Sequence, residues 1–316
     1  MGASASAAFP FWAWAVFTGL VVALLVLDLF VLHRKAKEIP FKEALWLSGF
    51  WIAVSLAFGG FVWFVGGADA GSRYLTAYLV EKSLSIDNVF VFAVIFSGLA
   101  VPEKYRYHVL LWGVIGALVF RLLFILAGSA LLSAFDWLVY VFGAFLVFTG
   151  IRLLRSGNDE ETDPQDNRAL KLLRRFLPFT EEYQGDNFFV RQDGKRYATP
   201  LLTALVVIEV SDVIFAIDSV PAVLSITQTT FVAYSAMAFA VLGLRALYFA
   251  LEGLVDRFVY LHYGLAAILI FLGVEFVLQG FGVHVPIYVS LGVIAAVIAA
   301  SIVFSLRATS GEKTDG

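Results

Sequence analysis

The chain lacks cysteine altogether and has few other soft metal ligands, with two methionines and four histidines. The absence of cysteine excludes disulfides, thiolate metal sites, iron–sulfur clusters and a cysteine nucleophile. So few methionines and histidines argue against a copper(I) path or a zinc cluster. Charged residues are also scarce, at 15%, and their net charge of −3 argues against a nucleic-acid partner. The side chains and backbone that remain for chemistry carry carboxylate, amide, hydroxyl and carbonyl oxygens.

Apolar residues, by contrast, make up 60% of the 316 positions and give a mean hydropathy of +0.86. Soluble domains contain roughly 45–50% apolar and about 25% charged residues, so a soluble globular protein is excluded. A helix needs about 20 mainly apolar residues to cross the hydrocarbon core of a bilayer. Nine stretches meet this need, at about 11–32, 44–66, 74–98, 107–132, 136–154, 200–225, 230–250, 258–279 and 286–306. We therefore predict an all-α, multi-pass membrane protein with one transporter domain over residues 1–316.

The distribution of lysine and arginine predicts the orientation of these spans. If the N-terminus is outside, 18 of the 22 basic residues fall on the cytoplasmic side and only Arg73 falls in an outer connection. Cytoplasmic loops carry the excess of basic residues, so we expect the N-terminus outside and the C-terminus inside. The polar segment 155–199 is then a cytoplasmic loop, with a small hairpin over 188–197, and 308–316 is a short polar tail.

The middle of the chain repeats itself. Phe120–Leu123 in the fourth span is answered by Leu244–Leu247 in the seventh, 124 residues later, and Phe148–Ile151 in the fifth by Phe271–Val274 in the eighth, 123 residues later. The repeating unit is three spans, so its second copy enters the membrane from the opposite side. We predict two inverted repeats, spans 3–5 and 6–8, the plan of many secondary transporters. Chance likeness between hydrophobic helices is the alternative.

Acidic residues occur at membrane depth, where each ionised carboxylate costs roughly 2.5–3.5 kcal/mol. The third span carries Glu81 and Asp87, and the sixth carries Glu209, Asp212 and Asp218. A separation of six residues is about 9 Å along a helix, so the acids form stepped levels. Because the two spans run antiparallel, we expect Asp87 and Asp212 to meet near the midplane. Glu81 and Asp218 then lie nearer the outer face, and Glu209 lies slightly inward.

Neighbouring residues add oxygen ligands and counter-charges. Pro221 removes a helical donor and crowds the carbonyl of Ile217, which we expect to be free as a ligand. The further candidates are one amide (Asn88), two hydroxyls (Ser83 and Ser211), two basic side chains (Lys82 and Arg121) and a weaker acid in the first span (Asp28). Arg121 is either a simple counter-charge or part of the coupling. An all-oxygen site of this kind suits a hard divalent cation.

The two acidic motifs, Glu81–Phe90 and Glu209–Ala222, resemble those of the TerC family of integral membrane proteins. The resemblance extends over nearly the whole chain and includes Phe188–Arg191, Tyr197–Leu201 and Leu242–Ala246. It implies manganese efflux across the bacterial inner membrane, with the ion site at the motif acids and Asn88. The family is also associated with tellurite resistance and with membrane-protein assembly. Glu275 departs from the pattern, because a basic residue is expected there.

From these features we expect a secondary transporter that exports a divalent metal ion, with Mn²⁺ as its substrate and protons as the coupling ion. No P-loop occurs, and we expect no organic cofactor and no enzymatic activity. Three alternatives remain open. The same acids could line a divalent-cation channel, the loop 155–199 could serve a membrane scaffold or assembly factor, and a bound metal could activate water in a hydrolase.

Overall fold

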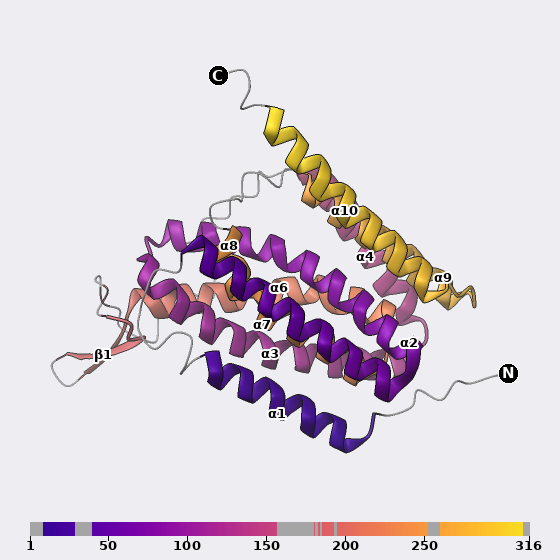
Figure 1. Cartoon of the computed structure of the whole chain (residues 1–316), viewed down its shortest axis with the longest axis horizontal. Helices are drawn as coiled ribbons and strands as arrows, with labels where there is room; N and C mark the ends of the chain where they lie inside the picture. Colours follow the sequence, from indigo (N-terminus) through magenta and orange to yellow (C-terminus); the bar gives the residue numbers. More distant parts are fainter. Residues whose placement is uncertain are drawn as a thin grey trace.

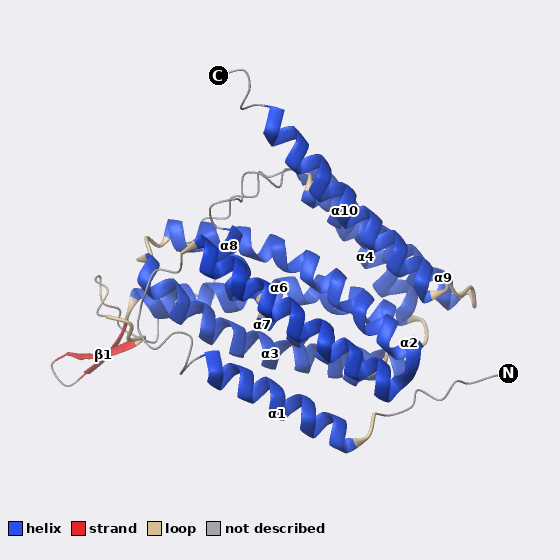
Figure 2. Ribbon diagram, viewed as in Figure 1, coloured by secondary structure: helices blue, strands red, loops and turns tan. Residues whose placement is uncertain are grey.

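The computed structural model describes residues 9–28, 40–156, 180, 183, 185–192, 195–251 and 260–311. Nearly all of them are helical (Figure 2). The helices are α1 (Phe11–Leu27), α2 (Phe41–Gly98), α3 (Glu103–Ala134), α4 (Leu138–Ser156), α6 (Pro200–Ile226), α7 (Thr230–Leu242), α8 (Leu244–Leu251), α9 (Leu261–Gly280) and α10 (Ile287–Gly311). Seven helical segments of the described part are long and apolar enough to cross a membrane. The chain is thus a multi-pass helical membrane protein, as predicted, and the count of nine spans stays a prediction.

Helix α2 covers two of the predicted spans because its chain turns back on itself. A straight helix of 58 residues would be about 87 Å long. Gly67, however, has φ 82° and ψ 179°, a backbone conformation outside the helical region. The Tyr74 hydroxyl donates to the Ser55 carbonyl at 3.0 Å, although 19 residues separate them. The segments before and after Gly67 therefore lie side by side and antiparallel.

The central bundle consists of α2, α3, α6, α7 and α8, and α1 lies along one flank of it (Figure 1). Helix α7 is at its centre, with every residue from Ser235 to Leu242 buried. Large side chains such as Phe64 and Leu123 are exposed, at 89% and 56%, where lipid surrounds the bundle. A polar central helix would not pack here, and the apolar sequence of α7 accounts for its place.

Helices α4, α9 and α10 form a second group beside the bundle (Figure 1). Glycines let α4 and α9 approach closely. A Cβ added to Gly143 would lie 2.8 Å from the Gly273 carbonyl oxygen, and one added to Gly150 would lie 2.8 Å from that of Ala266. Small residues at such contacts are how membrane helices pack without a hydrophobic driving force.

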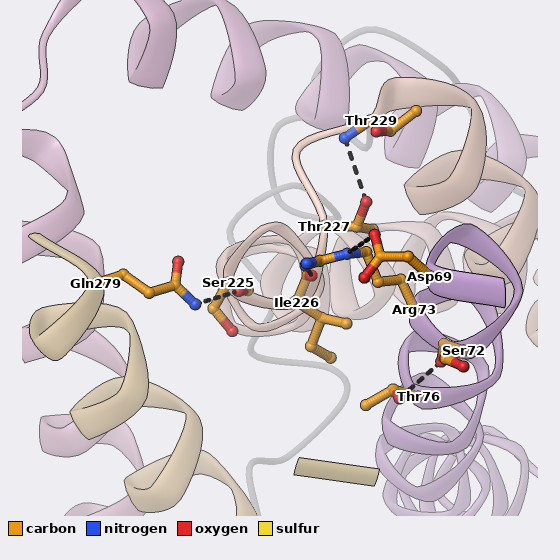
Figure 3. Close-up of polar contacts among 9 residues, drawn as sticks. All are labelled: Asp69, Ser72, Arg73, Thr76, Ser225, Ile226, Thr227, Thr229 and Gln279. Atoms are coloured by element: carbon orange, nitrogen blue, oxygen red, sulfur yellow. Dashed lines mark hydrogen bonds and ion pairs between the residues drawn. The ribbon is translucent and has the colours of Figure 1, made fainter. Parts of the chain in front are cut away.

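Helix α6 is fixed at both ends. It starts with Pro200 after Thr199, an arrangement typical of helix N-termini. At its other end, Arg73 of α2 donates to the Ile226 carbonyl at 2.6 Å and Gln279 of α9 donates to the Ser225 carbonyl at 3.1 Å (Figure 3). These side chains satisfy carbonyls that have no helical partner and tie α6 to both helix groups.

The structure confirms the hairpin that we predicted over residues 188–197, within the polar segment 155–199. β1 (Phe189–Gln192) and β2 (Lys195–Ala198) pair antiparallel, with Val190 opposite Tyr197. The Thr199 amide donates to the Phe188 carbonyl at 3.0 Å, which joins the hairpin to the start of α6. The rest of segment 155–199 lies mostly outside the described residues.

Candidate functional site

A buried arginine of α3 joins acidic residues of α2 and α6. Arg121 Nη1 donates to Glu81 Oε1, and Nη2 donates to Asp212 Oδ1 at 3.0 Å. Arg121 and Glu81 are completely buried and Asp212 is 2% exposed. Nη1 also lies 3.4 Å from the hydroxyl of Ser219 on α6. The structure therefore brings Glu81 and Asp212 together, with the guanidinium of Arg121 between them, whereas the helical spacing predicts Glu81 beside Asp218 and nearer the outer face.

Several oxygens around this group have no hydrogen-bond partner among the described residues. They are Glu81 Oε2, Asp212 Oδ2, Glu209 Oε2 and the hydroxyl of Ser85, one turn from Glu81. Buried oxygens without partners are unfavourable in hydrocarbon unless a cation or proton joins them. Two carboxylates share one arginine, so the group of Glu81, Arg121 and Asp212 carries one unbalanced negative charge when ionised.

Glu209 lies one turn from Asp212 and points toward α3. A Cβ added to Gly116 would collide with the carboxylate of Glu209. A side chain at this position would push the carboxylate of Glu209 out of its place. No group of three or more His, Cys, Asp or Glu side chains within the described part is close enough to hold a metal ion.

Asp218 contacts a different helix. Thr149 of α4 donates to Asp218 Oδ1 at 3.3 Å, and the side chain is half-buried. Ser219, the next residue, turns to Arg121 instead. Asp218 thus lies between α6 and the second helix group rather than in the Arg121 group.

The other predicted basic side chain, Lys82, serves a helix end rather than an acid. Its Nζ donates to the Ala240 carbonyl at 3.3 Å, close to the C-terminus of α7. A cation is favourable there because the last carbonyls of a helix are unpaired and the helix dipole is negative. Ser83 and Ser211 donate to carbonyls of their own helices, of Leu79 at 2.7 Å and Val207 at 2.9 Å.

Asp28 belongs to a separate ion pair. Its carboxylate contacts Arg245 of α8, and the Tyr107 hydroxyl donates to its Oδ1 at 2.8 Å. Arg245 Nη1 in turn donates to the Tyr107 oxygen at 2.8 Å. This group joins α1, α3 and α8 and pairs one acid with one base, which fits a structural ion pair.

The remaining predicted residues take no part in a described contact with the acids. The Asp87 side chain lies outside the described residues, so its meeting with Asp212 stays a prediction. Asn88 is buried, at 3% exposed, and Pro221 is buried inside α6. The Ile217 side chain is 46% exposed toward the lipid, and a ligand role for its carbonyl also stays a prediction.

Sequence reasoning missed Gly116, Tyr107 and Thr149. A glycine in an apolar helix gives no sign of the carboxylate it accommodates. Thr149 stands in the repeated segment Phe148–Ile151, which could have drawn attention to it. Glu275 now has a described environment, because its two oxygens lie 2.9 and 3.0 Å from the hydroxyl of Ser290 on α10.

Comparison with known proteins gives a family match over most of the chain. The model of the Integral membrane protein TerC family matches residues 66–313. Membrane protein STKORF319 of Myxococcus xanthus is 46% identical over 293 residues, 93% of this chain and 91% of its own. Alx of Escherichia coli K12, described as a proposed membrane-bound redox modulator, is 40% identical over 301 residues, 92% of this chain and 93% of its own. No solved structure matches the chain significantly.

Proposed function

The chain belongs to the TerC family of integral membrane proteins, and on this premise we propose that it exports divalent metal ions, with Mn²⁺ as substrate, in exchange for protons. The observation that carries the proposal is the buried group of Glu81, Arg121 and Asp212. Two carboxylates from different helices face one another with one arginine between them and unpartnered oxygens beside them. Hard divalent ions such as Mn²⁺ prefer such oxygen ligands.

The contact between α4 and α9 supports the inverted repeats that such a transporter uses. The repeat offset of 123 residues relates Gly150 to Gly273 and Val147 to Ile270. A Cβ on Gly150 would lie 2.7 Å from the Ile270 side chain, and one on Gly273 would lie 2.8 Å from that of Val147. Replacing each residue by its counterpart in the other repeat converts the contact of Gly150 with Ile270 into that of Gly273 with Val147. A pseudo-two-fold axis between the halves accounts for this, and transporters with inverted repeats place their sites where the halves meet.

Export of a divalent cation from a cell that is negative inside needs a driving force. The electrical work is about 4.6 kcal/mol per 100 mV for two charges. Because the sequence has no P-loop, proton entry is the simplest source. Carboxylates that hold either protons or the metal couple the two movements directly.

Substitution of the acids tests this function. Asp212→Asn and Asp87→Asn should each lower Mn²⁺ flux into proteoliposomes by about two orders of magnitude or more, since each removes a charged ligand. The exposed acid Asp136 supplies the control variant Asp136→Asn, which should transport normally. Normal Mn²⁺ flux in Asp212→Asn would refute the assignment. Parallel assays with Mg²⁺ and Ca²⁺ establish the preferred ion.

The same preparation separates an antiporter from a channel. An antiporter gives Mn²⁺ flux that rises with an imposed pH difference and acidifies or alkalinises the lumen in proportion. A channel with the same acids gives flux that follows the metal gradient and voltage alone.

The name of the Escherichia coli relative raises redox modulation as a second candidate. This chain contains no cysteine, so its own side chains cannot exchange thiols and disulfides. A redox effect would therefore be indirect, through the metal that the chain moves.

A further inference from the structure

The guanidinium of Arg121 occupies the place between two carboxylates where a transported cation is expected. Its two terminal nitrogens divide between Glu81 and Asp212, which come from different helices. It is among the largest side chains that are fully buried. A guanidinium stays protonated in proteins, so the positive charge at this position is permanent.

Arg121 differs from the other buried arginine in the charge that it balances. Within the part of the chain that the structure describes, Arg245 contacts one carboxylate, that of Asp28. Arg121 contacts two, and their second oxygens, Glu81 Oε2 and Asp212 Oδ2, have no hydrogen-bond partner among the described residues. A simple structural ion pair needs only one acid, and the second acid leaves room for a further positive charge.

Resting on the proposed transport function, we propose that Arg121 is an internal substitute for the transported cation. It holds Glu81 and Asp212 together while the site is empty and leaves at least one of them when a divalent ion binds. A metal ion with two charges neutralises both carboxylates, and the permanent charge of Arg121 is then repelled by the metal and no longer needed by the acids.

A third carboxylate, that of Glu209 on α6, lies against the helix that carries Arg121. The Glu209 carboxylate packs against Gly116, five residues N-terminal to Arg121 on α3. Glu209 and Asp212 lie one turn apart on α6, so a guanidinium that leaves Asp212 has a second carboxylate on the same face of that helix. Glu209 Oε2 has no hydrogen-bond partner among the described residues and can accept the displaced guanidinium.

The exchange of cations has a consequence for the transport cycle. Net export requires the metal-free protein to return from its outward-facing to its inward-facing conformation. Two unbalanced carboxylates between packed helices oppose that movement. Arg121 balances one of them during the return, and the proton that is exchanged for the metal balances the other. Exchange of metal for metal does not need the metal-free return, so it does not need Arg121.

Two fluxes measured on the same proteoliposomes test this role. For Arg121→Gln, net Mn²⁺ flux should fall about tenfold further than exchange of radioactive for unlabelled Mn²⁺. Arg245→Gln, the matched control, should lower both fluxes in equal proportion. In the double variant Glu81→Gln/Arg121→Gln, which removes one charge of each sign, the ratio of net flux to exchange should return toward the wild-type ratio.

Equilibrium binding of Mn²⁺ to purified Arg121→Lys gives a second reading that does not depend on the glutamine variant folding. A lysine cannot bridge two carboxylates as a guanidinium does, so it competes less with the metal. Its Mn²⁺ dissociation constant should be about threefold or more below that of the wild type. A purely structural arginine gives an equal or weaker affinity, which would overturn the inference.

The outcomes separate the two proposals. If wild-type protein moves no Mn²⁺, the proposed function fails. If it does move Mn²⁺ but Arg121→Gln keeps the wild-type ratio of net flux to exchange, or the double variant keeps the ratio of Arg121→Gln, only the role of Arg121 fails.

Discussion

Arg121 and Arg245 lie 124 residues apart, at matching positions of the predicted repeat, and each is buried against acid. Their surroundings differ at the residue scale. Arg245 has one carboxylate and a tyrosine hydroxyl, from Asp28 and Tyr107. Arg121 has two carboxylates, which leaves an excess of negative charge. The charges of Arg245 and Asp28 cancel, so this group should stabilise the fold. The group around Arg121 keeps an excess negative charge, so it should bind a cation.

Removing one partner of the Asp28 pair should therefore affect folding more than metal binding. Asp28→Asn leaves Arg245 buried without its counter-charge, and such changes cost about 3–5 kcal/mol. We expect a lower melting temperature in detergent and an unchanged Mn²⁺ affinity of the protein that remains folded. The double variant Asp28→Asn/Arg245→Gln should lose less stability than the two single losses added together. Strictly additive losses would show that the two side chains do not interact.

The sequence predicted which acids lie buried in the bundle better than it predicted how they pair. Acids in an apolar helix are conspicuous, so Glu81 and Asp212 are found from the sequence alone. Their depths were inferred from helical spacing, with Glu81 nearer the outer face than Asp212. In the structure both contact Arg121, and Glu81 shares Nη1 with Ser219, seven residues beyond Asp212. The axial shift between two helices depends on their packing, which residue spacing within each helix does not determine.

At the scale of elements, the crossing of α4 and α9 joins the two predicted repeats. The backbones approach so closely that Gly143 and Gly273 each have the other's carbonyl oxygen within 3 Å of an added Cβ, at 2.8 and 2.6 Å. A backbone atom cannot turn aside as a flexible side chain can. Any side chain at these positions must move the helices apart.

Gly143→Ala should consequently destabilise the protein by about 1–3 kcal/mol, the usual effect of overpacking. Gly292→Ala on α10 is the matched control, because an added Cβ there meets nothing within 4 Å. That variant should be neutral or more stable by up to about 1 kcal/mol, since alanine favours a helix. Thermal unfolding in detergent measures both. Equal melting temperatures for the two variants would contradict the close crossing.

The elements themselves were largely predictable because each apolar stretch is long and bounded by polar or helix-starting residues. Prolines precede α1, α2 and α3, and Pro200 opens α6. The boundary within α2 was the harder case. The sequence reasoning left residues 67–73 as a connection, whereas helical structure continues on both sides of Gly67. A single glycine with positive φ is enough to reverse the chain, and its conformation is fixed by the packing of the two arms rather than by local composition.

At the scale of the whole molecule, the orientation in the membrane decides which end of the site faces the cytoplasm. The charge distribution predicts that the hairpin of β1 and β2 is cytoplasmic and that the connection between α9 and α10 is outside. The structure places the hairpin at one end of the bundle, next to the start of α6 (Figure 1). Export through Glu209, Asp212 and then Asp218 follows only if that end is the inner one.

Cysteine labelling tests the orientation directly, because the natural chain has no cysteine to interfere. Val283 is 52% exposed in the connection between α9 and α10, and Asp186 is exposed beside the hairpin. In intact cells with the outer membrane permeabilised, a membrane-impermeant maleimide should label Val283→Cys at once and Asp186→Cys only after the inner membrane is opened. Ala222→Cys, which is completely buried in α6, should resist labelling in both cases. The opposite order of labelling would invert the predicted topology and turn the proposed export path into an import path.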